Sequence, residues 1–157
     1  MAADREMRER VLAAVPQQAP FRFIDEILEV DAEHIVGAYR FKEDESFYRG
    51  HFPGRPVTPG VILVEAMAQT GVVAFGLYLV MAQGREAELK SGNLTTLFTV
   101  IENMEFTGMV KPGERVIIRG EKVYFRKGNL KAKVSMEREN GEPVASGVMA
   151  GMGVNLQ

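Results

Sequence analysis

Residues 60–83 read GVILVEAMAQTGVVAFGLYLVMAQ, and this stretch decides the fold. A helix drawn over it is apolar on every face, so it has to be covered on every face. At about 1.5 Å of rise per residue, the stretch is also long enough to cross a bilayer. Glu65 and Gln69 oppose a membrane span, because a carboxylate among lipid tails costs roughly 2.5 kcal/mol or more. The stretch therefore predicts a long helix buried inside the protein itself, without a membrane span.

The segments around this helix have the pattern of strands. Strands are predicted at residues 23–30, 35–41, 94–106, 115–125, 130–137 and 143–154. A short amphipathic helix is predicted at 4–15, and a polar connection at 85–93. One long helix and about six mostly antiparallel strands indicate a single α+β domain over residues 1–157. In this domain a curved sheet wraps the helix, and a second copy of the chain covers what the sheet leaves open.

Composition excludes several classes of protein. The 19 basic and 21 acidic residues give a net charge of −2, which argues against a strongly basic nucleic-acid binder. The sequence contains no cysteine, so disulfides and thiolate metal sites are excluded. Charged residues occupy positions 4–6, where a secretory signal needs an apolar run. We therefore expect a cytoplasmic protein.

The loop before the long helix carries the candidate chemistry. Three prolines between residues 53 and 59 stiffen the loop that follows His51. Gly60 lies at the helix start, where free N–H groups and the positive dipole end favour a developing oxyanion. Burial would raise the pKa of Glu65 while the dipole would lower it, so the sequence leaves its protonation state open. A histidine, a carboxyl group and an amide donor suit acid–base chemistry beside a carbonyl.

Taken alone, a loop histidine is more often structural, and a glutamate near a helix start is more often a partner of the dipole. The motif as a whole is more specific. Residues 51–61, HFPGRPVTPGV, and 65–69, EAMAQ, resemble the signature of the β-hydroxyacyl-acyl carrier protein dehydratases of fatty acid synthesis. The resemblance extends over residues 20–154. It implies a hotdog fold and the dehydration of (3R)-hydroxyacyl thioesters to trans-2-enoyl thioesters, in fatty acid or related lipid biosynthesis.

The resemblance also implies roles for individual residues. His51 would remove the α-proton, and Glu65 of the neighbouring subunit would protonate or position the departing hydroxyl. The Gly60 N–H would bind the thioester oxygen, the Val57 carbonyl would orient the His51 ring, and Gln69 would hold Glu65. The acyl chain would run through an apolar tunnel at the subunit interface, with candidate lining residues Phe47, Phe52, Val61 and Phe98. No metal or cofactor is implied.

The implied partners are an acyl carrier protein with a phosphopantetheine-linked substrate, and further copies of the chain in a homodimer or a trimer of dimers. A basic cluster, Arg126, Lys127, Lys131 and Lys133, is a candidate landing site for the acidic carrier. The alternative is an ordinary solvated sheet face. Two other functions stay open, a hotdog acyl thioesterase and a non-catalytic module that binds acyl thioesters. The sequence leaves chain length, branch specificity and pathway undetermined. Departures from the family signature include Thr58, where methionine is usual, and Gln17-Gln18, where histidine and arginine are usual.

Overall fold

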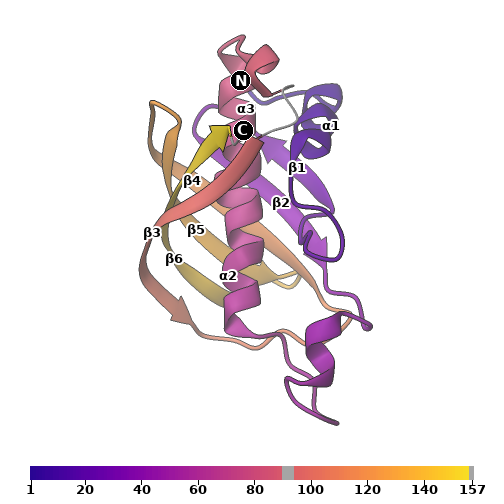
Figure 1. The fold of residues 1–157 in the computed structure, drawn as a ribbon. Coiled ribbons are helices and arrows are strands. Elements are labelled where there is room, and N and C mark those ends of the chain that lie inside the picture. The colour runs from indigo at the N-terminus through magenta and orange to yellow at the C-terminus, as the bar shows by residue number, and fades with distance from the viewer. Residues whose placement is uncertain (90–93, 156–157) are drawn as a thin grey trace.

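The computed structural model describes residues 1–89 and 94–155 (Figure 1). Its elements are α1 (Arg5–Ala14), β1 (Glu26–Val30), β2 (His34–Arg40), η1 (Ser46–Arg49), α2 (Gly60–Ala68), η2 (Gln69–Ala74), α3 (Phe75–Ala82), η3 (Glu86–Leu89), β3 (Leu94–Phe106), β4 (Arg115–Arg126), β5 (Asn129–Arg138) and β6 (Pro143–Asn155). The first part of the connection expected at 85–93 contains the short 3₁₀ turn η3. The rest of that connection, residues 90–93, lies outside the described residues.

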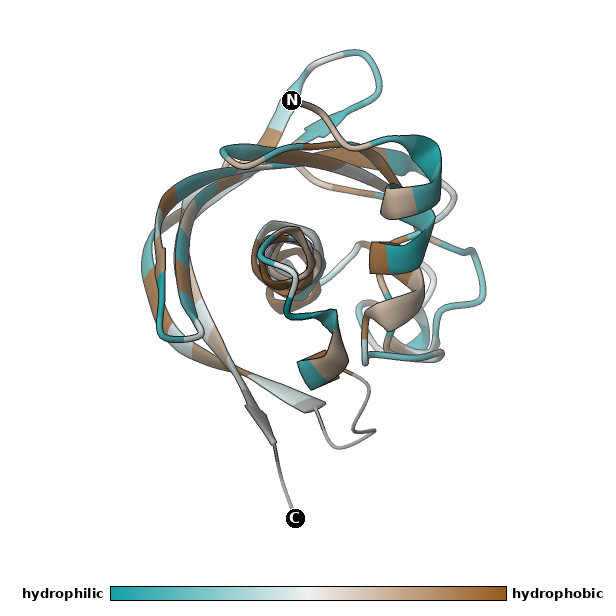
Figure 2. Ribbon diagram, turned by 90° about the horizontal axis from the view of Figure 1, so that it is seen from above, coloured by the Kyte–Doolittle hydropathy of each residue, from teal (hydrophilic) through white to brown (hydrophobic). Residues whose placement is uncertain are grey.

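The strands form one six-stranded sheet in the order β1-β2-β4-β5-β6-β3, and every neighbouring pair is antiparallel. Seen from above, the sheet curves around the central helix, which stands end-on inside it (Figure 2). This arrangement confirms the α+β hotdog fold expected from the sequence. The strands β1 and β3 form the two edges of the sheet. The position of β3 matters for the site because this edge strand runs past the helix face that the sheet does not cover.

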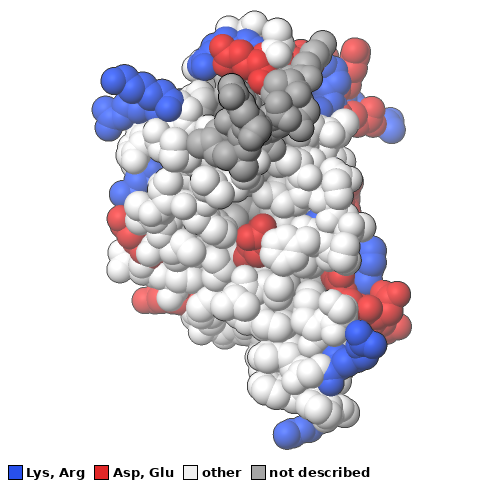
Figure 3. Space-filling model, viewed as in Figure 1, with Lys and Arg blue, Asp and Glu red and all other residues white. Residues whose placement is uncertain are grey.

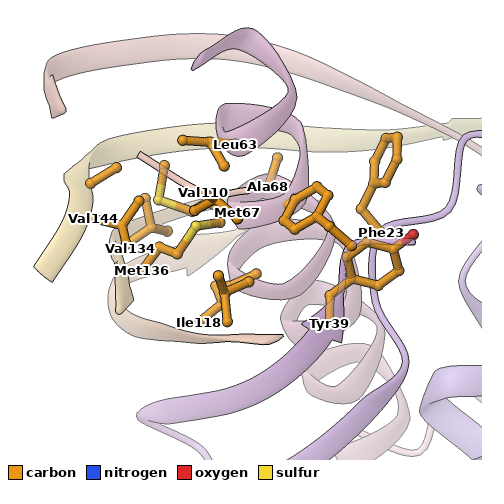
Figure 4. Packing of buried hydrophobic residues seen from close by; sticks show 14 of the residues in the cluster. Phe23, Tyr39, Leu63, Met67, Ala68, Val110, Ile118, Val134, Met136 and Val144 are labelled. Carbon is orange, nitrogen blue, oxygen red and sulfur yellow. The ribbon is translucent and has the colours of Figure 1, made fainter. Parts of the chain in front are cut away.

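The central helix runs continuously through α2, η2 and α3, and η2 is a π-helical turn. Residues 60–82 form a helix that is long and apolar enough to cross a membrane. However, 67% of an 18-residue apolar stretch of this helix is buried inside the protein, as in a core helix. Met67 packs with Val134 and Met136 of β5 in the main core cluster (Figure 4). The helix lies close against the sheet at Gly71, where an added Cβ would lie 2.5 Å from the Val134 Cγ1 atom.

The start of β1 differs from the sequence expectation. The apolar run at residues 23–30 predicts a strand from Phe23, but β1 begins at Glu26. The Phe23 N–H instead donates to the side-chain oxygen of Gln69 at 2.6 Å. The Gln69 side chain of the central helix thus accepts the hydrogen bond that the Phe23 N–H would otherwise donate to a neighbouring strand. This long-range contact cannot be read from the local pattern.

Candidate active site

The loop that carries His51 is tied down at several points. The Thr58 N–H donates to the Val110 carbonyl at 2.9 Å, and the Thr58 hydroxyl lies 2.6 Å from the hydroxyl of buried Tyr48. Thr58 therefore has a structural role that a methionine could not fill, since methionine has no hydroxyl. The tight turn between Phe52 and Arg55 closes with mutual backbone hydrogen bonds and uses Gly54 at φ 72°, which favours glycine.

His51 is half-buried, and its ring is oriented from both sides. The Nδ1 atom lies 2.8 Å from the Val57 carbonyl oxygen, and the ring stacks on Phe52 with 4.2 Å between ring centres. A carbonyl oxygen can only accept, so Nδ1 carries the hydrogen of this bond. In the neutral imidazole the Nε2 lone pair is then free to accept a proton. The geometry agrees with the orienting role expected for Val57.

Glu65 is held by Gln69, one helical turn further along. The Gln69 amide nitrogen donates to Glu65 Oε1 at 2.9 Å and to the Phe21 carbonyl at 3.0 Å. Together with the bond from the Phe23 N–H, these contacts fix the fully buried Gln69 side chain. Burial raises the pKa of Glu65, and the hydrogen bond from Gln69 partly offsets this effect. Glu65 thus holds its proton more tightly than an exposed glutamate does.

A cavity of about 420 Å³ extends along one side of the central helix from Glu65. Its helix wall is a stripe at helical spacing that passes through Val72, Gly76 and Val80. Strand β3 contributes Phe98 to the opposite wall. Figure 3 shows acidic atoms in a hollow at the middle of a face that otherwise carries little charge. A carboxyl group at one end of an apolar cavity is the main chemical feature of this face.

The start of the helix lies beside this region. Hydrogen bonding within the helix begins at Ile62, whose N–H donates to the Pro59 carbonyl at 2.9 Å. The Gly60 N–H comes before this bond, among the donors that a helix start leaves unsatisfied. A Cβ at Gly60 would lie 3.3 Å from the Phe106 ring. The absence of a side chain therefore lets the Phe106 ring of β3 rest against the helix start.

The four candidate tunnel residues have different positions. Phe98 lines the cavity and is 44% exposed. Phe47 packs against the main core cluster and contacts the ring of Tyr48. Phe52 and Val61 are exposed, at 49% and 76%. Among the residues that the structure describes, the wall of this cavity within one chain includes Glu65 and Phe98. It does not include His51, Phe47, Phe52 or Val61.

The basic cluster lies on β4, β5 and the turn between them. Arg126 stacks over the Tyr124 ring at 4.8 Å, and Lys127 occupies the turn at φ 50°. Lys131 pairs with Glu102 of β3 at 3.5 Å, so part of its charge is locally balanced. Lys133 is exposed on β5. The four residues therefore divide between the hairpin tip and the outer face of the sheet.

Sequence reasoning missed one polar contact in the cavity wall. The Gln17 amide nitrogen donates to the Thr96 hydroxyl at 2.9 Å and joins the segment after α1 to β3. Both residues line the cavity. The Gln17 Oε1 atom is buried, and the described residues offer it no hydrogen-bond partner. The two residues are 79 positions apart, so no local pattern indicates the contact. The unusual Gln17-Gln18 pair was the one available signal.

Comparison with known proteins identifies the family. Residues 15–147 match the model of the FabA-like domain. The chain is 42% identical over 134 residues to the 3-hydroxyacyl-acyl-carrier-protein dehydratase FabZ of Acetivibrio thermocellus, a match that covers 85% of this chain and 84% of that protein. It is 34% identical to the FabZ of Caldicellulosiruptor bescii, over 88% of this chain and 92% of that one.

Solved structures support the fold. The dehydratase heterocomplex ApeI:P from Xenorhabdus doucetiae matches with a TM-score of 0.76 at 15% identity, over 92% of this chain and 91% of that chain. A hypothetical thioesterase from Streptococcus pneumoniae matches with a TM-score of 0.55 at 15% identity, over 84% and 87% of the two chains. These likenesses concern architecture alone. The sequence matches show that this chain belongs to the FabA-like family, together with the FabZ dehydratases.

Proposed function

We propose that this protein is a 3-hydroxyacyl-acyl carrier protein dehydratase, which removes water from (3R)-hydroxyacyl thioesters to form trans-2-enoyl thioesters. The observation that carries the proposal is Glu65, a carboxyl group with a raised pKa in the wall of an apolar cavity, in a chain related over most of its length to FabZ dehydratases. We also assign the reaction to the cytoplasm and to fatty acid or related lipid biosynthesis.

His51 acts as the general base. With Nδ1 bonded to the Val57 carbonyl, Nε2 is the atom that accepts the α-proton of the thioester. The negative charge that develops on the thioester oxygen is stabilised by the Gly60 N–H and the positive end of the helix dipole. Phe52, stacked on the imidazole, limits the tilt of the ring.

Glu65 acts as the general acid. Burial favours its neutral form, and the hydrogen bond from Gln69 occupies Oε1. The Oε2 atom is then available to give its proton to the departing β-hydroxyl, which leaves as water. The substrate gives one proton to His51 and takes one from Glu65, so its protons balance. The two side chains return to their starting state when a proton passes from His51 back to Glu65 through solvent.

We further propose that each active site combines His51 of one chain with Glu65 of a second copy in a homodimer. Strand β3 is a sheet edge, and among the described residues its outer side pairs with no other strand, which favours pairing with a strand of another chain. The same strand exposes large apolar side chains, namely Leu97, Phe98, Val100, Ile101 and Phe106. An apolar edge of this kind favours a two-fold contact between copies.

Mixed dimers test both the pairing and the reaction. His51→Ala and Glu65→Gln are each expected to abolish turnover of a 3-hydroxyacyl thioester. If the site is shared, co-refolding equal amounts of the two variants restores one intact site in every mixed dimer. Statistical mixing then gives about a quarter of wild-type activity. Full activity of either single variant would reject the assigned roles, and no recovery on mixing would reject the shared site.

A thioesterase with the same fold would give a different product. Dehydration conserves the thioester and produces a conjugated enoyl group, whereas hydrolysis releases a free thiol. A thiol reagent and the absorbance of the enoyl thioester, followed on the same sample, separate the two activities. A module that only binds the substrate would give neither signal.

The carrier is proposed to dock on the basic cluster at the β4–β5 hairpin. The hairpin tip is the stronger candidate, because Lys131 is already paired with Glu102, whereas Arg126 and Lys127 form no ion pair with the described residues. Reversing both tip charges with Arg126→Glu and Lys127→Glu is expected to raise KM for the carrier-bound substrate. The same substrate carried on coenzyme A serves as the control and should react at the wild-type rate.

A further inference from the structure

The cavity beside the central helix extends far beyond the proposed reacting groups, and the inference drawn from it rests on the proposed dehydratase function. Glu65 lies at one end, and Val80 lines the same wall fifteen residues later. At about 1.5 Å of rise per residue, this stripe of the helix is roughly 22 Å long. An extended carbon chain advances about 1.2 Å per bond, as judged from the reach of the extended polypeptide backbone. The wall is therefore long enough for an acyl chain well beyond eight carbons.

The walls along this length suit an uncharged hydrocarbon. Val72 and Leu77 face the cavity from the helix, and Leu130 and Met152 line it from the sheet. The charged lining residues of the far end, Arg85 and Glu88, pair with each other at 2.9 Å and are about half exposed. Transfer of an alkyl chain from water to such a wall is favourable. The charge at this end is confined to that exposed ion pair, and the neighbouring lining residue Leu89 is apolar.

Gly76 lies on the helix wall of the cavity, at a position where the surrounding structure has room for a side chain. A Cβ at Gly76 would meet Leu130 Cδ2 at 3.8 Å, which is ordinary van der Waals contact. Packing explains the glycines at two other positions. A Cβ at Gly71 would lie 2.5 Å from a Val134 methyl, and a Cβ at Gly151 would lie 2.8 Å from a Val72 methyl. Neither the backbone nor the packing demands glycine at 76, yet its absent side chain keeps the cavity open.

We propose that Gly76 is a specificity-determining position: its missing side chain lets the acyl chain of a long-chain (3R)-hydroxyacyl thioester pass this point of the cavity. Gly76 lies eleven residues beyond Glu65, or about 16 Å along the helix. At about 1.2 Å per bond, this distance corresponds to roughly thirteen bonds of an extended chain. Chains of four or eight carbons end before Gly76, whereas chains of sixteen carbons pass it.

The experiment compares Gly76→Leu with Gly76→Ala and with the control Ala82→Leu. Ala82 lies at the exposed end of the same helix, outside the cavity wall. We measure kcat/KM for 3-hydroxyacyl thioesters of four, eight and sixteen carbons. For Gly76→Leu, the sixteen-carbon substrate is expected to lose about four-fold per excluded methylene, or tens of fold for two or three of them. The shorter substrates are expected to react as with the wild type, and Gly76→Ala should have an intermediate effect. Ala82→Leu should leave all three unchanged.

Two outcomes would overturn the proposal. An equal loss at every chain length together with dissociation of the dimer would mean that a second copy of the chain, and not the acyl chain, fills the cavity. Unchanged kinetics at all three lengths would mean that the acyl chain takes another path. The proposed function is tested separately by the wild type. If the wild type reacts with none of the substrates, calorimetric binding of enoyl thioesters of the three lengths still decides whether Gly76 limits the chain.

Discussion

Replacing Gln69 with leucine should destabilise the protein and shift the titration of Glu65 together. Gln69 is fully buried and makes three hydrogen bonds, two to the backbone of Phe21 and Phe23 and one to Glu65. Leucine is close in size but makes none of them. The Phe23 N–H would be left buried without an acceptor, and each such orphaned group costs about 1–3 kcal/mol. The Phe21 carbonyl would also lose the hydrogen bond from Gln69. Together, the two losses should lower the free energy of unfolding by about 2–4 kcal/mol.

Thr70 provides a matched control in the same π turn. Its side chain is as deeply buried as that of Gln69, but its hydroxyl has no hydrogen-bond partner among the described residues. Thr70→Val should therefore leave stability unchanged or raise it by up to about 1 kcal/mol. Urea unfolding of both variants measures the difference as a change in midpoint at constant slope. The reasoning is refuted if Gln69→Leu loses no more stability than Thr70→Val.

The pH dependence of Gln69→Leu adds a second measurement. The hydrogen bond from Gln69 lowers the pKa of Glu65 against the larger effect of burial. Without this bond the pKa of Glu65 should rise further. The limb of the pH–kcat/KM profile that reports Glu65 should then move to higher pH, which a purely structural role for Gln69 would not cause. An unmoved limb would separate Gln69 from Glu65 function.

Three further outcomes are expected. Burial places the pKa of Glu65 in the folded state above its ordinary value of 4.5. The stability that this group contributes is therefore complete below pH 4.5 and is lost as pH rises through the raised pKa. In urea titrations, Glu65→Gln should be more stable than the wild type at pH 7 but not at pH 4. Gly76→Ala should raise the free energy of unfolding by about 0.5–1 kcal/mol through helix propensity, whereas Gly71→Ala, with its Cβ 2.5 Å from Val134, should lower it by about 1–3 kcal/mol in the same titration. Ile101→Lys, on the exposed face of the edge strand, should give an inactive monomer in sedimentation velocity runs; an active monomer would contradict the shared site.

Local patterns were sufficient for most of the architecture. The apolar run at 60–83 predicted the central helix because a helix without a polar face can be stable in water only when other elements cover it. Alternation at residues 130–137 predicted β5 because successive side chains of a strand point to opposite faces. The start of β1 was wrong by three residues, since the Phe23 N–H bonds to Gln69 and not to a strand.

The sequence by itself determined the fold class, the family and the identity of the candidate catalytic groups, because these depend on periodicity and on a short contiguous motif. The tertiary structure alone decided how the groups are supported and where a substrate chain would lie. Three features depend on residues that are distant in sequence. They are the hydrogen bond between Gln17 and Thr96, the anchoring of Gln69 by the segment before β1, and the open space beside Gly76. Such contacts depend on how the sheet curves around the helix, and this curvature leaves no periodic signature in any one segment.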